Sequence, residues 1–138
     1  MNTYLIDTLV LKMIATPKEE SLRRWCEANN RSLFLSSASL TEVSVAVNKM
    51  PHSLSHRADA LQRWLNEIVT RFADRVHPAN AAISVRAGAI MPNMTSTHPR
   101  LRYHDAILLA TAEVHRHRLL TRREEILGRL TSARIAAI

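Results

Sequence analysis

The sequence has 138 residues, which is the size of one compact domain, so we expect residues 1–138 to form a single unit. Hydrophobic residues make up 46% of the chain and charged residues 22%, and this balance excludes an intrinsically disordered protein. The sequence has no apolar run of membrane-spanning length and no signal-peptide pattern, so we expect no membrane partner. Cys26 is the only cysteine, which excludes an internal disulfide and is typical of a cytoplasmic protein.

The chain is basic, with 19 Lys and Arg against 12 Asp and Glu and a formal net charge of +7. Such a charge suits an anionic partner such as nucleic acid or an acidic protein, although it is equally typical of a merely soluble surface. Aromatic residues make up only 4% of the chain, which argues against a platform that stacks single-stranded bases.

The first part of the chain predicts two strands and two helices. Residues 4–6 are a short apolar run that predicts a buried strand. A helix follows over 17–29, because a proline and two acidic residues are typical of a helix start. A second strand is expected at 33–35, and a capping box predicts the next helix over 39–50.

The strongest periodicity in the chain comes next, where apolar residues step by four and three positions over 54–72. This pattern predicts an amphipathic helix of about five turns. In chain order we then expect a strand at 75–77, a helix at 81–90, a loop at 91–102, an apolar helix from 105, and strands at 119–121 and 134–137.

Strands that alternate with helices predict an α/β fold with a mostly parallel sheet. Ligands of such sheets bind at the carboxyl ends of the strands. Asp7 and Thr121 end two predicted strands, while Glu42 and Asp105 begin helices that can return to the same edge. We therefore expect the three carboxylates to converge there.

Converging carboxylates repel one another unless a cation neutralises them, and their hard oxygen atoms suit Mg²⁺ or Mn²⁺. Such an ion activates water for phosphodiester cleavage, so the pattern favours a metal-dependent nuclease. Two of the three acids also have a purely structural explanation. Glu42 can be the third residue of its capping box, and Asp105 can be an ordinary first-turn acid.

Four short motifs resemble those of PIN-domain ribonucleases in the same order. They are Ile-Asp-Thr-Leu-Val-Leu at 6–11, Ser-Ala-Ser-Leu-Thr-Glu at 37–42, His-Asp-Ala-Ile-Leu-Leu-Ala-Thr-Ala at 104–112 and Leu-Leu-Thr-Arg at 119–122. Order and spacing are similar to those of the VapC-type toxins, including their FitB-like branch.

The resemblance implies a three-layer α/β/α fold with a central sheet of about five strands. It implies an endoribonuclease toxin of a type II toxin–antitoxin (plasmid stability) module that uses Mg²⁺ or Mn²⁺ to cleave RNA. It also implies a homodimer with a VapB-like antitoxin as its partner. Asp7, Glu42 and Asp105 inherit the catalytic and metal-binding roles, with Thr8 and Thr121 supporting them.

The sequence departs from the family at two motifs. Leu9 stands where the family has a small polar residue, and Arg123 and Ile126 stand where the fourth motif is acidic or amidic. Glu124 is the nearest candidate for a fourth acid. Arg123 either pairs with the carboxylates and competes with the metal, or grips RNA phosphate. The alternative function is therefore a degenerate PIN domain that binds antitoxin or RNA without cleaving.

A cationic segment lies further along the chain, where His115, Arg116, His117 and Arg118 follow the predicted apolar helix. Positive charge at a helix C-terminus favours the helix dipole. The same charges also suit contact with phosphate.

Overall fold

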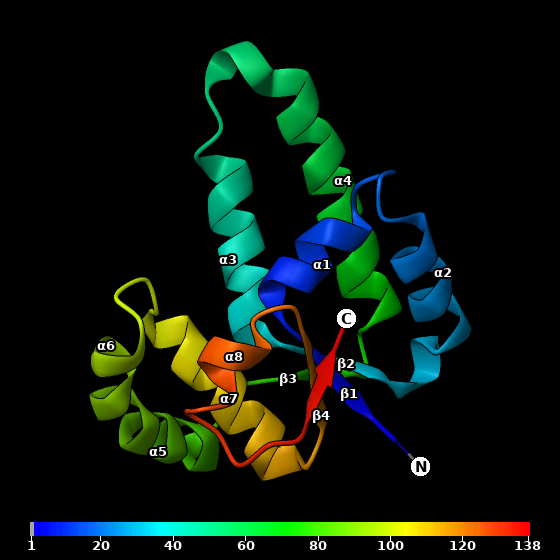
Figure 1. Ribbon diagram of the computed structural model, residues 1–138. Helices are drawn as coiled ribbons and strands as arrows, with labels where there is room; N and C mark the ends of the chain where they lie inside the picture. Colours follow the sequence, from blue (N-terminus) through cyan, green and yellow to red (C-terminus); the bar gives the residue numbers. More distant parts are fainter. Residues whose placement is uncertain (1) are drawn as a thin grey trace.

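A computed structural model describes residues 2–138 and shows a five-stranded sheet between two layers of helices (Figure 1). The strand order is β3-β2-β1-β4-β5, and every neighbouring pair is parallel. This confirms the expected three-layer α/β/α fold. The strands are β1 (Tyr4–Ile6), β2 (Leu33–Ser36), β3 (Val76–His77), β4 (Arg118–Thr121) and β5 (Ile135–Ala137).

The two central strands bury both of their faces, because successive side chains of a strand point to opposite sides of the sheet. Leu5 of β1 and Leu119 of β4 pack into one hydrophobic core. Their neighbours Ile6 and Leu120 pack into the other. All four are at most 1% exposed, which explains why these strands read as continuous apolar runs.

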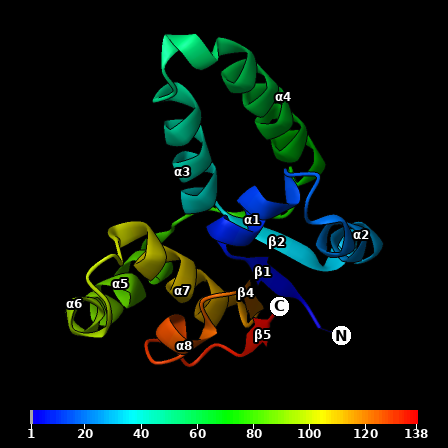
Figure 2. The same ribbon diagram turned by 45° about the horizontal axis from the view of Figure 1, so that its top comes forward.

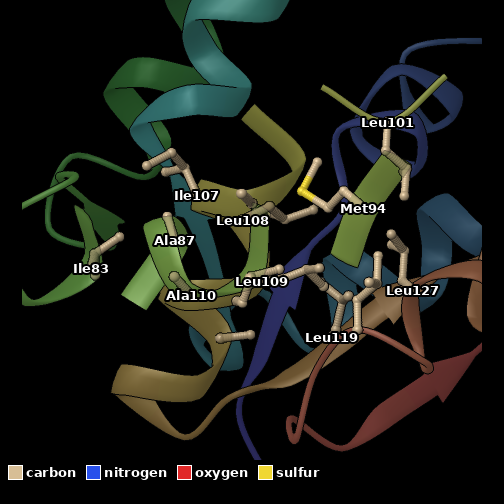
Figure 3. Packing of buried hydrophobic residues seen from close by; sticks show 14 of the residues in the cluster. Ile83, Ala87, Met94, Leu101, Ile107, Leu108, Leu109, Ala110, Leu119 and Leu127 are labelled. Atoms are coloured by element: carbon tan, nitrogen blue, oxygen red, sulfur yellow. The ribbon is translucent and has the colours of Figure 1, made fainter. Parts of the chain in front are cut away.

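Helices fall into two groups, one on each core. The first core takes residues from α5 (Ala81–Ile90), α6 (Met94–Thr97), α7 (Tyr103–His115) and α8 (Glu124–Leu127). Figure 3 shows side chains of these helices packed together with Leu101 and with Leu119 of β4. The second core takes residues from α1 (Thr8–Ile14), α2 (Glu20–Ala28), α3 (Ser37–Asn48) and α4 (Ser55–Arg71). Short 3₁₀ turns lie at Asn30–Ser32, His52–Leu54 and Met91–Asn93.

Helices α3 and α4 form an arm whose far end projects away from the sheet (Figure 2). Their connection and the outer turns of α4 are mostly exposed, whereas Leu65 and Ile68 near the base of α4 are buried. Among residues 2–138 there is no helix with both the length and the hydropathy that a membrane span needs.

All five predicted strands are present, but three local predictions are wrong. Helix α1 was not expected, and the predicted loop 91–102 contains helix α6. The capping box at 39–42 does not form, because α3 starts earlier. Ser36 is its N-cap, and the Ser36 side chain accepts a hydrogen bond from the backbone N–H of Ala38.

Candidate active site

Asp7 lies at the carboxyl end of β1, where the chain turns into α1. Its backbone N–H donates to the carbonyl of Leu120 at 3.0 Å, which places Asp7 beside the end of β4. Its side chain is completely buried. The hydroxyl of Thr121 donates to Oδ2 of Asp7 at 2.7 Å, so β4 supplies the first partner of this carboxylate.

Asp105 lies in the first turn of α7 and is 4% exposed. One of its oxygens has the structural role foreseen for a first-turn acid, because Oδ2 accepts a hydrogen bond from the backbone N–H of Arg102 at 2.9 Å. The other oxygen, Oδ1, points to the end of β4, where it meets Arg123. Asp105 therefore caps its helix and also faces Asp7 across a shared cation.

The guanidinium of Arg123 joins the two aspartates. Its Nε and one Nη donate to the two oxygens of Asp7 at 2.9 and 2.8 Å, and the same Nη donates to Oδ1 of Asp105 at 2.9 Å. The backbone N–H of Arg123 donates to the Thr121 hydroxyl at 2.9 Å, so Thr121 holds both Asp7 and the turn that carries the arginine. Of the two alternatives for Arg123, pairing with the carboxylates or gripping RNA phosphate, the structure shows pairing with the carboxylates.

Charge pairing dominates the electrostatics of this cluster. Burial lowers the pKa of the Arg123 guanidinium, but its hydrogen bonds and charge contacts with Asp7 and Asp105 outweigh burial and raise the pKa above its ordinary value. A forked, permanently charged guanidinium matches a carboxylate with two parallel hydrogen bonds, which a lysine cannot reproduce. The two buried carboxylates are therefore satisfied by a cation of the chain itself.

Glu42 reaches the same region from the second turn of α3 and pairs with a different cation. Its Oε1 is buried and receives no hydrogen bond of good geometry, and its close contact is the Nε2 atom of His104. The same Nε2 lies 3.7 Å from Oδ2 of Asp105. The contact with the Glu42 carboxylate, opposed by burial, raises the pKa of His104. His104 begins the motif at 104–112, but the sequence pattern does not indicate that its side chain meets Glu42.

The other residues singled out in the sequence, Thr8, Glu124 and Leu9, make no side-chain hydrogen bond or ion pair with Asp7 or Asp105 within residues 2–138. Thr8 is buried, but its hydroxyl pairs with that of Ser39 at 2.7 Å and with neither aspartate. Glu124 begins α8 and is exposed, and within residues 2–138 it has no ion pair or side-chain hydrogen bond to the cluster. The structure does not bring Glu124 to Asp7. Leu9 is 45% exposed, so the apolar substitution there faces solvent.

Comparison with known proteins assigns the fold to a family. A sequence profile of the PIN domain matches residues 4–130. The chain belongs to the PIN domain family. PIN domains are generally of nuclease type, and PIN nucleases generally use divalent metal ions. No curated protein matches the sequence.

Several solved structures match over almost the whole chain. DNA-bound VapBC from Salmonella typhimurium is 16% identical with a TM-score of 0.81, covering 99% of this chain and 98% of that one. FitAcB from Neisseria gonorrhoeae is 21% identical with a TM-score of 0.79, covering 97% of both chains. VapBC2 from Rickettsia felis, bound to promoter DNA, is 14% identical with a TM-score of 0.80, covering 99% and 98%. At these identities the likeness shows a common fold.

The PIN family raises the question whether a divalent metal fits these residues. Carboxylate oxygens are suitable ligands in kind. In the arrangement described, however, Arg123 occupies the space between Asp7 and Asp105, and Glu42 faces His104. Within residues 2–138 no three His, Cys, Asp or Glu side chains surround a common point where an ion could sit. A metal therefore does not fit this PIN site while Arg123 keeps its place.

A broad groove opens beside the cluster, with a volume of about 930 Å³. Glu42 and His104 form part of its wall, so the groove meets the acidic site at that point. Its walls come from α1, α3 and the start of α7, and they carry three cationic side chains together with an exposed tyrosine. These four residues are Lys12, Lys49, Arg102 and Tyr103.

Proposed function

We propose that this PIN domain is the toxin of a VapC-type toxin–antitoxin pair, that it binds RNA, and that Arg123 holds its ribonuclease activity off. The observation that carries this proposal is the cluster of Asp7, Asp105 and Arg123 at the carboxyl edge of a PIN sheet. Buried paired acids at this edge are typical of a site for phosphate chemistry. Their neutralisation by an arginine is not typical of a site ready for a metal.

The groove beside the cluster supports RNA as the ligand. Lys12, Lys49 and Arg102 place positive charge along it, and positive charge is the main source of affinity for a phosphate backbone. Tyr103 is 61% exposed in the same wall and offers one ring on which a base can stack. A single-stranded RNA lying in this groove would pass Glu42 and His104.

An antitoxin partner is supported by two observations. The solved structures that share this fold are described as VapBC and FitAB complexes. The net charge of +7 suits the acidic segment of a partner protein. We expect the product of the neighbouring gene to copurify with this chain and to separate from it at high salt. Light scattering of the purified chain checks the homodimer that the resemblance implies.

A second candidate function, binding of RNA or antitoxin without cleavage, is favoured by Arg123 itself. The guanidinium satisfies both aspartates, so the acids need no other cation. In this second function Arg123 stays on the carboxylates and the domain does not cleave RNA, whereas the first function requires that Arg123 leaves them.

A cleavage assay on single-stranded RNA with Mn²⁺ or Mg²⁺ separates the two candidates. We expect Arg123→Asp to cleave RNA much faster than the wild type, because the variant frees Asp7 and Asp105 and restores an acid at this position. Adding Asp7→Asn to this variant should abolish the gain. If Arg123→Asp stays inactive but still copurifies with the antitoxin, the binding function is favoured. If the wild type cleaves as fast as the variant, Arg123 is not an obstacle.

A further inference from the structure

A second hollow lies at the amino ends of the strands, on the opposite edge of the sheet from Asp7. It has a volume of about 440 Å³. The residues before β1 and β5, the end of α7 and the start of β4 form its walls. The side chains that matter here are three arginines from three segments, Arg116, Arg118 and Arg134, together with the polar residues Asn2, Thr3 and Ser132.

The three arginines have no acidic partner among residues 2–138. The acids Glu113, Glu19 and Asp7 pair with Arg86, Arg122 and Arg123. Within the described residues, the side chains of Arg116, Arg118 and Arg134 take part in no ion pair and no hydrogen bond. Arg116 and Arg134 are exposed and Arg118 is half-buried. Three cations on one hollow repel one another, and an anion bound between them removes that repulsion.

The one acid in the wall, Glu113, is already committed to other partners. It pairs with Arg86, and its Oε1 accepts hydrogen bonds from the Thr131 hydroxyl at 2.7 Å and the Ser132 N–H at 2.8 Å. Burial raises the pKa of Glu113, but Arg86 and these hydrogen bonds outweigh burial and lower the pKa to about 2. The charge of Glu113 is therefore balanced by Arg86, and the hollow keeps the positive charge of its three arginines.

The neighbouring histidine contributes no charge. His117 is buried, and both ring nitrogens are engaged, Nδ1 with the Thr3 hydroxyl at 2.7 Å and Nε2 with Nε2 of His77 at 2.8 Å. Burial and the adjacent His77 and His115 lower the pKa of His117 to about 4. The sequence-based expectation that His117 adds to a cationic helix end is therefore wrong. The charge of the hollow comes from arginines and does not change near neutral pH.

Arg116 stands in a conformation that costs free energy. With φ at 56° and ψ at 38° it is left-handed, and it is the one residue other than glycine with positive φ among residues 2–138. This helix end normally takes glycine. An arginine here also favours the dipole of α7, but the dipole explains one cation and leaves Arg118 and Arg134 without an explanation.

We propose that this amino-edge hollow binds phosphate groups of RNA, as a second contact away from the acidic edge. Arginine forks bind phosphate oxygens with two parallel hydrogen bonds, and the Ser132 hydroxyl adds a donor to the wall. The inference rests on the proposed RNA-binding function. It adds a second RNA contact at the amino ends of the strands, on the opposite edge of the sheet from Asp7 and Asp105.

The test compares RNA affinity at several salt concentrations, using fluorescence anisotropy of a labelled single-stranded RNA with EDTA to stop cleavage. The hollow variant combines Arg116→Gly, Arg118→Gln and Arg134→Gln. Each lost phosphate contact on a single strand lowers the salt slope of log K by about 0.7, so the three together lower it by about 2. Since glycine suits the left-handed position, Arg116→Gly alone should not lower the Tm, which separates lost binding from lost folding.

A matched control removes the same charge from the arm, with Arg57→Gln, Arg63→Gln and Arg71→Gln on exposed positions of α4. A smaller slope in the hollow variant than in this control supports the proposal, and equal slopes overturn it. If equal slopes accompany tight RNA binding, the RNA-binding function survives without the hollow. If the wild type binds no RNA, both fall.

A thermal-unfolding measurement with added inorganic phosphate tests whether the ligand of the hollow is a free phosphate ion and not RNA. In one outcome, phosphate raises the Tm of the wild type and not that of the hollow variant, while the salt slope of log K for RNA is the same in the hollow variant and the control. That pair of results assigns the hollow to free phosphate and overturns the RNA proposal. A lowered RNA slope, with or without a phosphate response, supports it.

Discussion

Replacing Arg123 with glutamine should lower the free energy of unfolding by about 3 kcal/mol. The variant leaves the buried side chains of Asp7 and Asp105 without their cation. Removing one partner of a buried ion pair costs about 3–5 kcal/mol. The lower end applies here, because the Arg123 side chain is 24% exposed and water screens part of the interaction.

Thermal unfolding followed by circular dichroism measures this change. At the usual unfolding entropy per residue, a chain of 138 residues loses about 3–4 °C of Tm per kcal/mol, so Arg123→Gln should melt about 10 °C below the wild type. Mn²⁺ should raise the Tm of the variant, because Asp7 and Asp105 are then free to bind it. The wild type should not respond, since its carboxylates already hold a guanidinium.

Arg122→Gln is the matched control, because it removes an adjacent arginine of the same charge. Arg122 pairs with Glu19 on the surface, where the two side chains are 43% and 29% exposed. Exposed pairs contribute at most about 1 kcal/mol. Equal Tm losses for Arg122→Gln and Arg123→Gln, or an equal Mn²⁺ response of wild type and Arg123→Gln, would refute the assignment of Arg123 as the internal counter-ion.

Three further predictions concern other parts of the molecule. Burial lowers the pKa of His117 from 6.5 to about 4, so between these pH values the unfolded chain binds a proton that the folded chain does not; the free energy of unfolding should fall as the pH drops from 6.5 towards 4, by at most about 3 kcal/mol, and His117→Gln should remove this fall in urea titrations. Burial, helped by a neighbouring glutamate, raises the pKa of Cys26 to about 11, so a thiol reagent at pH 8 should modify it only after unfolding. Gly128→Ala should cost about 1–3 kcal/mol by urea titration, because a Cβ there would lie 2.6 Å from the backbone carbonyl oxygen of Glu124; an unchanged midpoint would show that α8 shifts freely.

The central strands β1 and β4 could be predicted from the sequence because they are buried on both faces and leave continuous apolar runs. Helix α1 could not, since the apolar run Leu9 to Leu11 has no period that separates a buried helix from a strand. The capping-box prediction failed for a related reason. A Ser-x-x-Glu pattern also arises inside a helix when, as in α3, the glutamate turns toward a neighbouring site.

The position of Asp7 could be predicted because an acid directly after a buried strand has few structural reasons to be there. Asp7 and Asp105 do meet at one edge, joined by Arg123. The sequence left open where the Arg123 head lies, because a long flexible side chain can reach either solvent or carboxylate from the same backbone position. The pairing of Glu42 with His104 depends on the packing of α3 against α7 and has no signal in the sequence.

The chain supplies the two partners of the acidic site at very different times during synthesis. Asp7 and Arg123 are 116 positions apart, and Thr121 is 114 positions from Asp7. At about 5–20 residues per second, a ribosome takes roughly 6–23 s to pass from one to the other. Strand β1 can pair with β2 during this interval, but its other neighbour, β4, does not yet exist. The Asp7 carboxylate therefore has neither its guanidinium nor the Thr121 hydroxyl until β4 and the turn after it have been made.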